Sequence, residues 1–308
     1  GVQRAQIVMH ANAAIAKVNI VPNARVHAAK TSVRRVWSVM TNATKGEVMP
    51  SIIIGGGRVG QALRDMGVEG DVVVRRGEAF PSEPKTGPIY VATRNDVLED
   101  VIKNCPADRR EDLVFMQNGM LQQFLDAQGL GANTQALIYF AVAALGDKPT
   151  DGVTELNPEG LTAATGKWAD AVAARFHNGD LSCHVLDAPT YEGSMYEKLI
   201  WICAMMLVGA QHEGAKVGDV ATTYKDEVVA LIEELLSGTT ACTGAKFAPG
   251  AVDRLIAYAK TVAHFPCGVK EFPWRNGYFY GLSEKAIADG KSDPFPTHTA
   301  LLKNIGAI

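Results

Sequence analysis

Short runs of β-branched apolar residues, separated by amphipathic segments, mark the first half of the chain. The first run, residues 51–54, leads into a glycine-rich stretch and then into an amphipathic segment, residues 61–66, which Gly67 ends. A second apolar run, residues 71–74, follows directly afterwards. This order predicts a strand, a tight turn, a helix and a second strand parallel to the first.

The same alternation continues along the chain. Apolar runs at residues 88–92, 112–116 and 135–145 predict three more buried strands, and the periodicity of residues 96–103 predicts a helix. Strands that alternate with helices form a doubly wound parallel sheet, so the expected fold class is α/β with a Rossmann-type sheet. Shorter apolar runs at residues 152–187 surround one predicted helix and indicate an additional sheet edge.

Helical periodicity replaces this alternation from residue 191 onward. We therefore expect three parts: a leader segment, a Rossmann domain, and a mostly helical C-terminal domain for substrate binding and dimerisation. The predicted parts cover residues 1–48, 49–190 and 191–308. The predicted C-terminal helices lie at residues 195–216, 224–236, 252–262, 277–288 and 297–305.

The glycine-rich stretch after the first predicted strand fits the spacing G-x-G-x-x-G. Gly55 would make the tight turn, Gly57 would let a pyrophosphate approach the backbone, and Gly60 would let the helix pack against the strand. Arg58 and Val59 open the predicted helix, whose N-terminal amide groups would face the phosphates. The sequence therefore predicts a dinucleotide-binding loop, and the alternative interpretation is a flexible turn.

Two arginines end the second predicted strand, where NAD-binding proteins carry an acidic residue. Arg75 and Arg76 would bind a 2′-phosphate, which a carboxylate would repel. We therefore predict that the Rossmann domain binds NADP; in the alternative interpretation both arginines are solvated surface charges. Arg94 and Asn118 end the next two predicted strands, and the carboxyl ends of parallel strands are where ligands bind.

Charge is unevenly distributed along the chain. The first 46 residues carry seven Lys and Arg and no acidic residue, whereas the remaining 262 carry 23 basic and 33 acidic residues. A basic segment rich in Ala, Val, Ser and Thr is typical of an organelle transit peptide, so we expect a chloroplast protein, with mitochondrion or cytoplasm as alternatives. The competing interpretation is a basic tail that binds nucleic acid or an anionic surface. The lack of dense Lys and Arg runs argues against it, and we expect no nucleic-acid partner.

Composition narrows the remaining classes. Apolar residues make up 47% of the chain and charged residues 20%, which suits a protein with buried cores. Five cysteines without paired spacing argue against a disulfide scaffold. No apolar run reaches the roughly 18 residues needed to cross a bilayer, so we expect no transmembrane segment. No Cys and His cluster has zinc-binding spacing, and we expect no metal site.

Three motifs, the last split in two, resemble those of the ketopantoate reductases, NADP-dependent members of the wider 6-phosphogluconate dehydrogenase-like group. The resemblance spans residues 50–305. Its segments are the glycine loop with the Arg76-Gly77 ending, residues 117–120 (Gln-Asn-Gly-Met), residues 196–199 (Tyr-Glu-Lys-Leu) and residues 271–277 (Glu-Phe-Pro-Trp-Arg-Asn-Gly).

This resemblance implies an NADPH-dependent reductase of a small 2-oxo acid or a related carbonyl. Lys198 corresponds to the catalytic lysine, Glu271 to a glutamate that binds substrate, and Asn118 to an asparagine beside the nicotinamide. Arg94 stands where the family commonly has a lysine near the cofactor. Hydride delivery to a carbonyl leaves negative charge on its oxygen, so Lys198 would act as the general acid, and burial would lower its pKa.

Structural alternatives remain for each of these residues. Lys198 could extend to the surface beside Glu197 and leave its helix purely structural. Asn118-Gly119 could be an ordinary turn. Glu271 could be a charge at the start of a helix, stabilised by the helix dipole.

The chain departs from the family where substrate would bind. Ile202 and Met206 occupy positions at which the family has asparagines, and Ala259 replaces a serine. We therefore expect either a less polar substrate or a non-catalytic NADP-binding or structural subunit of an organellar complex. A third possibility is a dehydrogenase of a hydroxy acid. Expected partners are a small carbonyl substrate and either a second copy of the chain or an organellar complex.

Overall fold

The computed structural model describes residues 46–308, and the predicted leader lies almost entirely outside these residues. Its centre is a seven-stranded sheet in the order β2-β1-β3-β4-β5-β6-β7. β1 to β5 are parallel, β6 pairs antiparallel with β5, and β7 is parallel to β6. The strands are β1 (Ile52–Ile54), β2 (Val72–Val74), β3 (Ile89–Val91), β4 (Leu113–Phe115), β5 (Gln135–Leu137), β6 (Ala163–Thr165) and β7 (His184–Val185).

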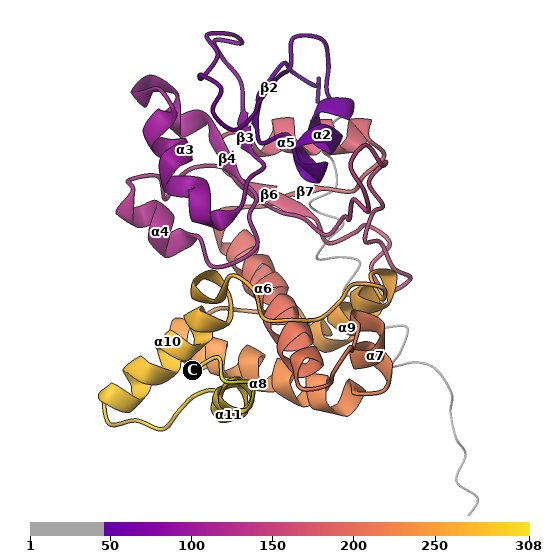
Figure 1. The fold of residues 1–308 in the computed structure, drawn as a ribbon, viewed down its shortest axis with the longest axis vertical. Helices are drawn as coiled ribbons and strands as arrows, with labels where there is room; N and C mark the ends of the chain where they lie inside the picture. Colours follow the sequence, from indigo (N-terminus) through magenta and orange to yellow (C-terminus); the bar gives the residue numbers. More distant parts are fainter. Residues whose placement is uncertain (1–45) are drawn as a thin grey trace, which may run out of the picture. The chain divides into compact units, whose positions relative to one another are not determined.

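Helices cover both faces of this sheet, and a mostly helical region follows it (Figure 1). The expected α/β class with a helical C-terminal region is thus confirmed. The helices of the sheet region are α2 (Arg58–Asp65), α3 (Leu98–Asn104), α4 (Gln122–Ala127) and α5 (Ala169–Asn178), with the 3₁₀ turns η1 (Asn95–Val97) and η2 (Ala107–Asp112). Those of the helical region are α6 (Ala188–Ala210), α7 (Val217–Thr222), α8 (Lys225–Thr243), α9 (Ala251–Thr261), α10 (Asn276–Ala288) and α11 (Pro296–Asn304), with the 3₁₀ turn η3 (Phe272–Trp274).

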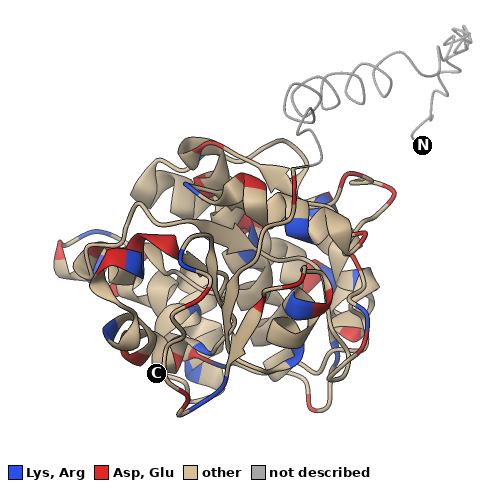
Figure 2. Cartoon of the chain, turned by 90° about the horizontal axis from the view of Figure 1, so that it is seen from above, with Lys and Arg blue, Asp and Glu red and all other residues tan. Residues whose placement is uncertain are grey.

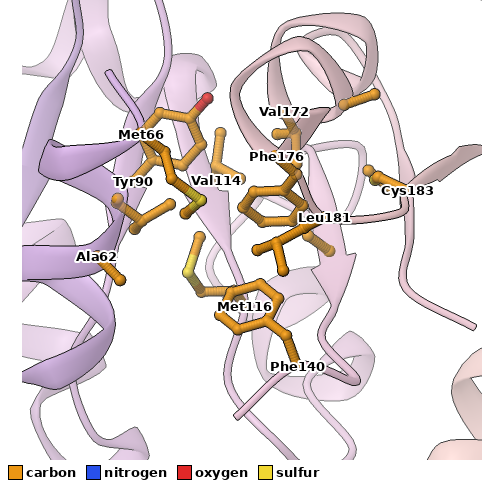
Figure 3. Packing of buried hydrophobic residues seen from close by; sticks show 14 of the residues in the cluster. Ala62, Met66, Tyr90, Val114, Met116, Phe140, Val172, Phe176, Leu181 and Cys183 are labelled. Carbon is orange, nitrogen blue, oxygen red and sulfur yellow. The ribbon is translucent and has the colours of Figure 1, made fainter. Parts of the chain in front are cut away.

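Strand side chains alternate between two apolar cores. Ile53 and Tyr90 face the core beneath α2 and α5, where Phe140 packs edge-on against Phe176 at 5.2 Å (Figure 3). Ile52 belongs to the opposite core beneath α3 and α4. Burial of both faces explains why the strands read as continuous apolar runs rather than as an alternation of apolar and polar residues.

One predicted strand is much shorter in the structure than the sequence indicated. The apolar run 135–145 forms a strand only at Gln135–Leu137. Beyond it, the backbone amide of Tyr139 donates to Thr162 Oγ1, and Ala141 pairs with Thr150 in an isolated bridge. Tyr139, Phe140 and Val142 are therefore buried by packing without a neighbouring ladder, whereas residues 143–145 are exposed.

α6 begins earlier than the periodicity predicted and leads from the sheet into the helical region (Figure 1). The carboxylate of Asp187 caps it by accepting from the Thr190 amide, and a proline stands in its first turn. The predicted boundary at residue 190 falls within the first turn of α6. Within residues 46–308, no helix is long and apolar enough to span a membrane.

Charges of both signs are interspersed along the described chain in the view of Figure 2. The single-sign charge that distinguishes the first 46 residues therefore does not continue into the described part of the chain. Among the described residues, no group of three or more His, Cys, Asp or Glu side chains could hold a metal ion.

Candidate functional site

The glycine loop connects β1 to α2 at the place where the strand order changes direction, between β1 and β3. Ligands of doubly wound sheets bind at this switch point. Gly55 has φ +109°, and a Cβ there would lie 2.5 Å from the carbonyl oxygen of Ala92. A Cβ on Gly60 would lie 1.8 Å from the carbonyl oxygen of Gly55. Both positions therefore require glycine, one for the turn and one for the approach of the helix.

Gly57 has the opposite surroundings, because no described atom lies within 4 Å of the position its Cβ would take. No described side chain caps the N-terminus of α2, which begins at Arg58. The first amide groups of this helix therefore face open space with unused donors. The buried hydroxyl of Thr93, beside Gly55, also lacks a hydrogen-bond partner within the described part of the chain.

The side chains of Arg58 and Val59 turn away from this open space. Arg58 Nη1 donates to the carbonyl oxygens of Val142 and Ala143 at 3.2 and 3.1 Å. Val59 packs against the core beneath α2. Their contribution to a bound phosphate would therefore come from the backbone.

Arg75 and Arg76 are exposed at the end of β2. The Arg75 side chain lies along the glycine loop, because a Cβ on Gly56 would be 3.3 Å from its Cγ and 3.5 Å from its Nε. The Arg75 amide donates to Glu78 Oε2 at 2.6 Å. A guanidinium group thus borders the loop, in the place expected for recognition of a 2′-phosphate.

Arg94, which was also predicted as a site residue, points to the surface. Its Nη2 lies 3.0 Å from Asp96 Oδ2 in an exposed ion pair. The next residue, Asn95, is only 3% exposed and was not predicted. Its side-chain amide donates to the Asn118 carbonyl oxygen at 3.1 Å, and its backbone amide donates to Glu271 Oε1 at 3.4 Å. Asn95 therefore connects two of the predicted site residues.

The Asn118-Gly119 segment forms a close backbone contact with Trp274, in addition to making a turn. Gly119 has φ +132°, and a Cβ there would be 2.6 Å from the carbonyl oxygen of Trp274. The Met120 amide donates to the same oxygen at 2.7 Å. This backbone contact between the end of β4 and η3 holds the helical region against the end of the strand. The glycine is needed because the two backbones meet at this point.

A small pocket of about 20 Å³ lies between the end of β4, the length of β5 and the first turns of α6. Asn118 and Lys198, which are far apart in the sequence, both line it. Its polar lining is completed by Gln117 and Gln135, neither of which was predicted as a site residue. The apolar lining residues are Phe115, Leu121, Ala136, Leu137, Tyr191, Met195 and Leu199.

Lys198 is buried in this region, with 7% of its surface exposed, so the alternative in which it extends to the surface is wrong. Burial and the Arg275 guanidinium lower the pKa of Lys198 from 10.5 to about 7. Its neighbour Glu197 faces elsewhere and forms a buried, two-pronged ion pair with Arg254, at 2.9 and 3.0 Å. Lys198 is thus poised to gain or lose a proton near neutral pH.

Glu271 immediately precedes η3 and has φ +48°, a conformation that few non-glycine residues adopt. Its carboxylate pairs with Arg275 Nη2 at 2.5 Å. Arg275 was not predicted, although its position four residues after Glu271 could have indicated the pair. Its Nε is buried without a hydrogen-bond partner in residues 46–308, so this guanidinium keeps a donor unused beside the site.

The residues that depart from the family pattern lie outside the pocket lining. Ile202 and Ala259 are buried, and Met206 is half-buried. None of the three is among the residues that line the pocket in the described structure. The polar side chains of the pocket come instead from residues that follow β4, from the first residue of β5 and from Lys198 on α6.

A parallel sheet with a glycine loop at its switch point, followed by a helical region, defines the class of dinucleotide-binding α/β folds. Within this class, the chain has the fold of the ketopantoate reductases. The enzyme of this family from Ralstonia eutropha JMP134 superposes with a TM-score of 0.58 at 16% identity, over 83% of this chain and 97% of that one.

Two further structures show the same fold. The dimeric ketopantoate reductase from Staphylococcus aureus has a TM-score of 0.54 at 17% identity, over 84% of this chain and all of that one. D-mandelate dehydrogenase in complex with NADH and anilino(oxo)acetate has a TM-score of 0.57 at 14% identity, over 83% and 98% of the two chains. No protein-family model matches the sequence, and no curated protein sequence is significantly similar to it.

Proposed function

We propose that this protein is an NADPH-dependent reductase of a small 2-oxo acid or a related carbonyl compound. The observation that carries the proposal is the buried Lys198, which lines the same pocket as Asn118. The structural neighbours support the reaction class, since they include ketopantoate reductases and a dehydrogenase bound to NADH and an oxo acid amide.

The residues around the glycine loop fit a dinucleotide. The open space at Gly57 and the uncapped start of α2 would take the pyrophosphate, and the unpaired Thr93 hydroxyl offers a further hydrogen bond. Arg75 and Arg76 would hold the 2′-phosphate that distinguishes NADP from NAD. When bound, the cofactor would supply the hydride.

Lys198 would supply the proton. As an ammonium group it would donate a hydrogen bond to the substrate carbonyl oxygen, stabilise the negative charge that develops there, and then transfer a proton to it. A pKa of about 7 keeps the ammonium form present at neutral pH while making the proton transfer easy. Asn118 would orient the substrate with its side-chain amide, and Arg275 would offer its unused donor to a carboxylate.

The pocket favours a substrate less polar than ketopantoate. Glu271, the expected partner of a substrate hydroxyl, does not line the pocket and is already paired with Arg275. A hydroxyl that lost its partner on entering the pocket would cost about 1–3 kcal/mol. We therefore propose a 2-oxo acid with an apolar side chain as the substrate.

A turnover assay tests this proposal. The purified protein is mixed with NADPH and a panel of 2-oxo acids that carry hydroxylated, aliphatic or aromatic side chains, and the loss of NADPH absorbance is followed. We expect oxidation of NADPH with at least one acid and higher kcat/KM for apolar side chains. Tight NADPH binding without turnover on any carbonyl would instead identify a non-catalytic NADP-binding subunit.

Assembly and location belong to the same proposal. We propose a homodimer, as the Staphylococcus aureus neighbour is described as dimeric, and a chloroplast location directed by the leader. Sedimentation of the purified protein tests the first, and imaging of a fusion to the complete leader tests the second.

A further inference from the structure

The amine of Lys198 lies among three aromatic rings. Its Nζ is 4.0 Å from the ring centroid of Tyr139, 5.1 Å from that of Tyr258 and 5.3 Å from that of Trp201. All three distances fall within the range of about 6 Å in which a cation is attracted to a ring face. The rings come from separate elements: Tyr139 follows β5, Trp201 lies on α6 and Tyr258 lies on α9.

The three rings also support one another. Tyr258 packs edge-on against Tyr139 and against Trp201, with centroids 4.7 Å apart in both pairs. Each ring is buried. Burial raises the pKa of the Tyr139 and Tyr258 phenols, so both rings stay neutral. We call Tyr139, Trp201 and Tyr258 the aromatic cage.

The carboxylates near the cage do not pair with Lys198 in the described structure. Glu197 is paired with Arg254, and Glu271 is paired with Arg275. Asp151, whose charge acts on Tyr258, accepts a hydrogen bond from the Ser182 amide through Oδ2, and its Oδ1 is buried without a hydrogen-bond partner in residues 46–308. Within the described residues, no carboxylate forms an ion pair with Lys198, and the nearby Arg275 repels its charge. The ring faces are thus the attractive groups that surround this ammonium.

We propose that Tyr139, Trp201 and Tyr258 are positioning residues that hold Lys198 as an ammonium ion in place of a carboxylate counter-ion. The catalytic consequence rests on the proposed function. A carboxylate partner would accept the N–H bonds of the amine and compete with a substrate oxygen for them. Ring faces attract the charge but accept hydrogen bonds weakly, so the N–H bonds stay available for the carbonyl.

The charge state of Lys198 can be measured without turnover. Protein labelled with ¹³C at the lysine ε-carbon is titrated by NMR, and the Lys198 signal is assigned by its loss in Lys198→Met. Tyr139→Leu removes the ring face, so we expect the pKa of Lys198 to fall by about 0.5 to 1 unit. Tyr139→Phe keeps the ring face, and we expect the pKa of the parent protein.

Two further comparisons complete the experiment. If Tyr139→Leu does not fold, the comparison of Tyr258→Leu with Tyr258→Phe repeats the test. Tyr224→Leu is the negative control, because it removes a ring that is stacked on His212, and it should leave the titration of Lys198 unchanged. Equal values in the Leu and Phe variants, or a higher value in the Leu variants, would overturn the proposal. If the pKa of Lys198 falls in the Leu variants but the protein reduces no carbonyl compound, the role of the aromatic cage stands and only the reductase function is refuted.

Discussion

The chemistry of Lys198 depends on neighbours that are distant in the sequence. Its burial could be predicted, because it is a single cation beside the longest apolar run of the chain. The aromatic rings at Tyr139 and Tyr258 and the guanidinium of Arg275 could not, since the tertiary fold brings them together from other elements. A sequence pattern can thus identify a reactive side chain without indicating what sets its pKa.

Arg94 and Asn95 show the same limit within two residues. Both follow β3, and the sequence marked the cation as the functional residue. In the structure Arg94 is paired with Asp96 at the surface, whereas Asn95 is buried and bonded to Asn118. The direction in which the chain leaves the strand decides which side chain faces the site, and no periodicity in the sequence reports that direction.

Selectivity for NADPH over NADH is a prediction at the residue scale. Arg76→Ala should raise the Kd for NADPH by about tenfold to a hundredfold, because a charged hydrogen bond to the 2′-phosphate contributes about 1.5–3 kcal/mol. The Kd for NADH, which lacks this phosphate, should change less than about threefold. Fluorescence titration measures both constants.

A matched control for this prediction is Arg64→Ala, which removes an arginine near the end of α2. It should leave both constants close to those of the parent protein. Equal losses of NADPH and NADH affinity in Arg76→Ala would contradict a role in 2′-phosphate binding.

At the scale of elements, the glycines of the loop are needed for two different reasons. Gly60 is needed for packing, since a Cβ there would meet the Gly55 carbonyl oxygen, whereas the space at Gly57 is open. The spacing of the motif predicted both glycines, and the structure distinguishes their roles.

Substitution by alanine tests this distinction. Gly60→Ala should lower the melting temperature and weaken NADPH binding, because overpacking costs about 1–3 kcal/mol. Gly57→Ala should leave the melting temperature unchanged and weaken NADPH binding alone, since its methyl group would occupy the space for the pyrophosphate. Circular dichroism melting and fluorescence titration measure the two effects.

Gly281→Ala in α10 is the control, because no described atom lies within 4 Å of the position of its Cβ. It should lower neither the melting temperature nor the affinity for NADPH. Unchanged NADPH affinity in Gly57→Ala would show that the pyrophosphate lies elsewhere.

Element boundaries were less predictable than element types. The three-isoleucine strand and the helical periodicity after residue 191 gave the correct kinds of structure. The run 135–145 gave a strand only in its first three residues, because an apolar run does not report the presence of a neighbouring strand, and its last three residues are exposed. Several residues between the strand and this exposed end are buried against the core instead.

At the scale of the whole described molecule, the site forms where the helical region meets the sheet. Gly119 meets Trp274 backbone to backbone, and Asn95 bonds Glu271 across the same junction. The pocket therefore exists only when both regions are folded together. The sequence predicted each half and the order of the motifs, but the contacts between the halves could be located only in the folded chain.

The central claim is that Lys198 donates the proton when a carbonyl is reduced. Because its pKa is about 7, the ammonium form is present below pH 7 and is lost above it. The rate of carbonyl reduction should therefore fall as the pH rises through about 7, and the reverse oxidation, which needs the neutral amine, should rise over the same interval.

Comparison of Lys198→Met with the parent protein tests this claim most directly, with kcat and the Kd for NADPH measured across this pH range. General acid catalysis contributes about 10²–10⁴-fold, so kcat for reduction should fall by at least about a hundredfold and lose its decline above pH 7. The Kd for NADPH should stay within about threefold, because the glycine loop and the arginines are untouched. A variant that keeps the parent kcat and pH profile would contradict the claim.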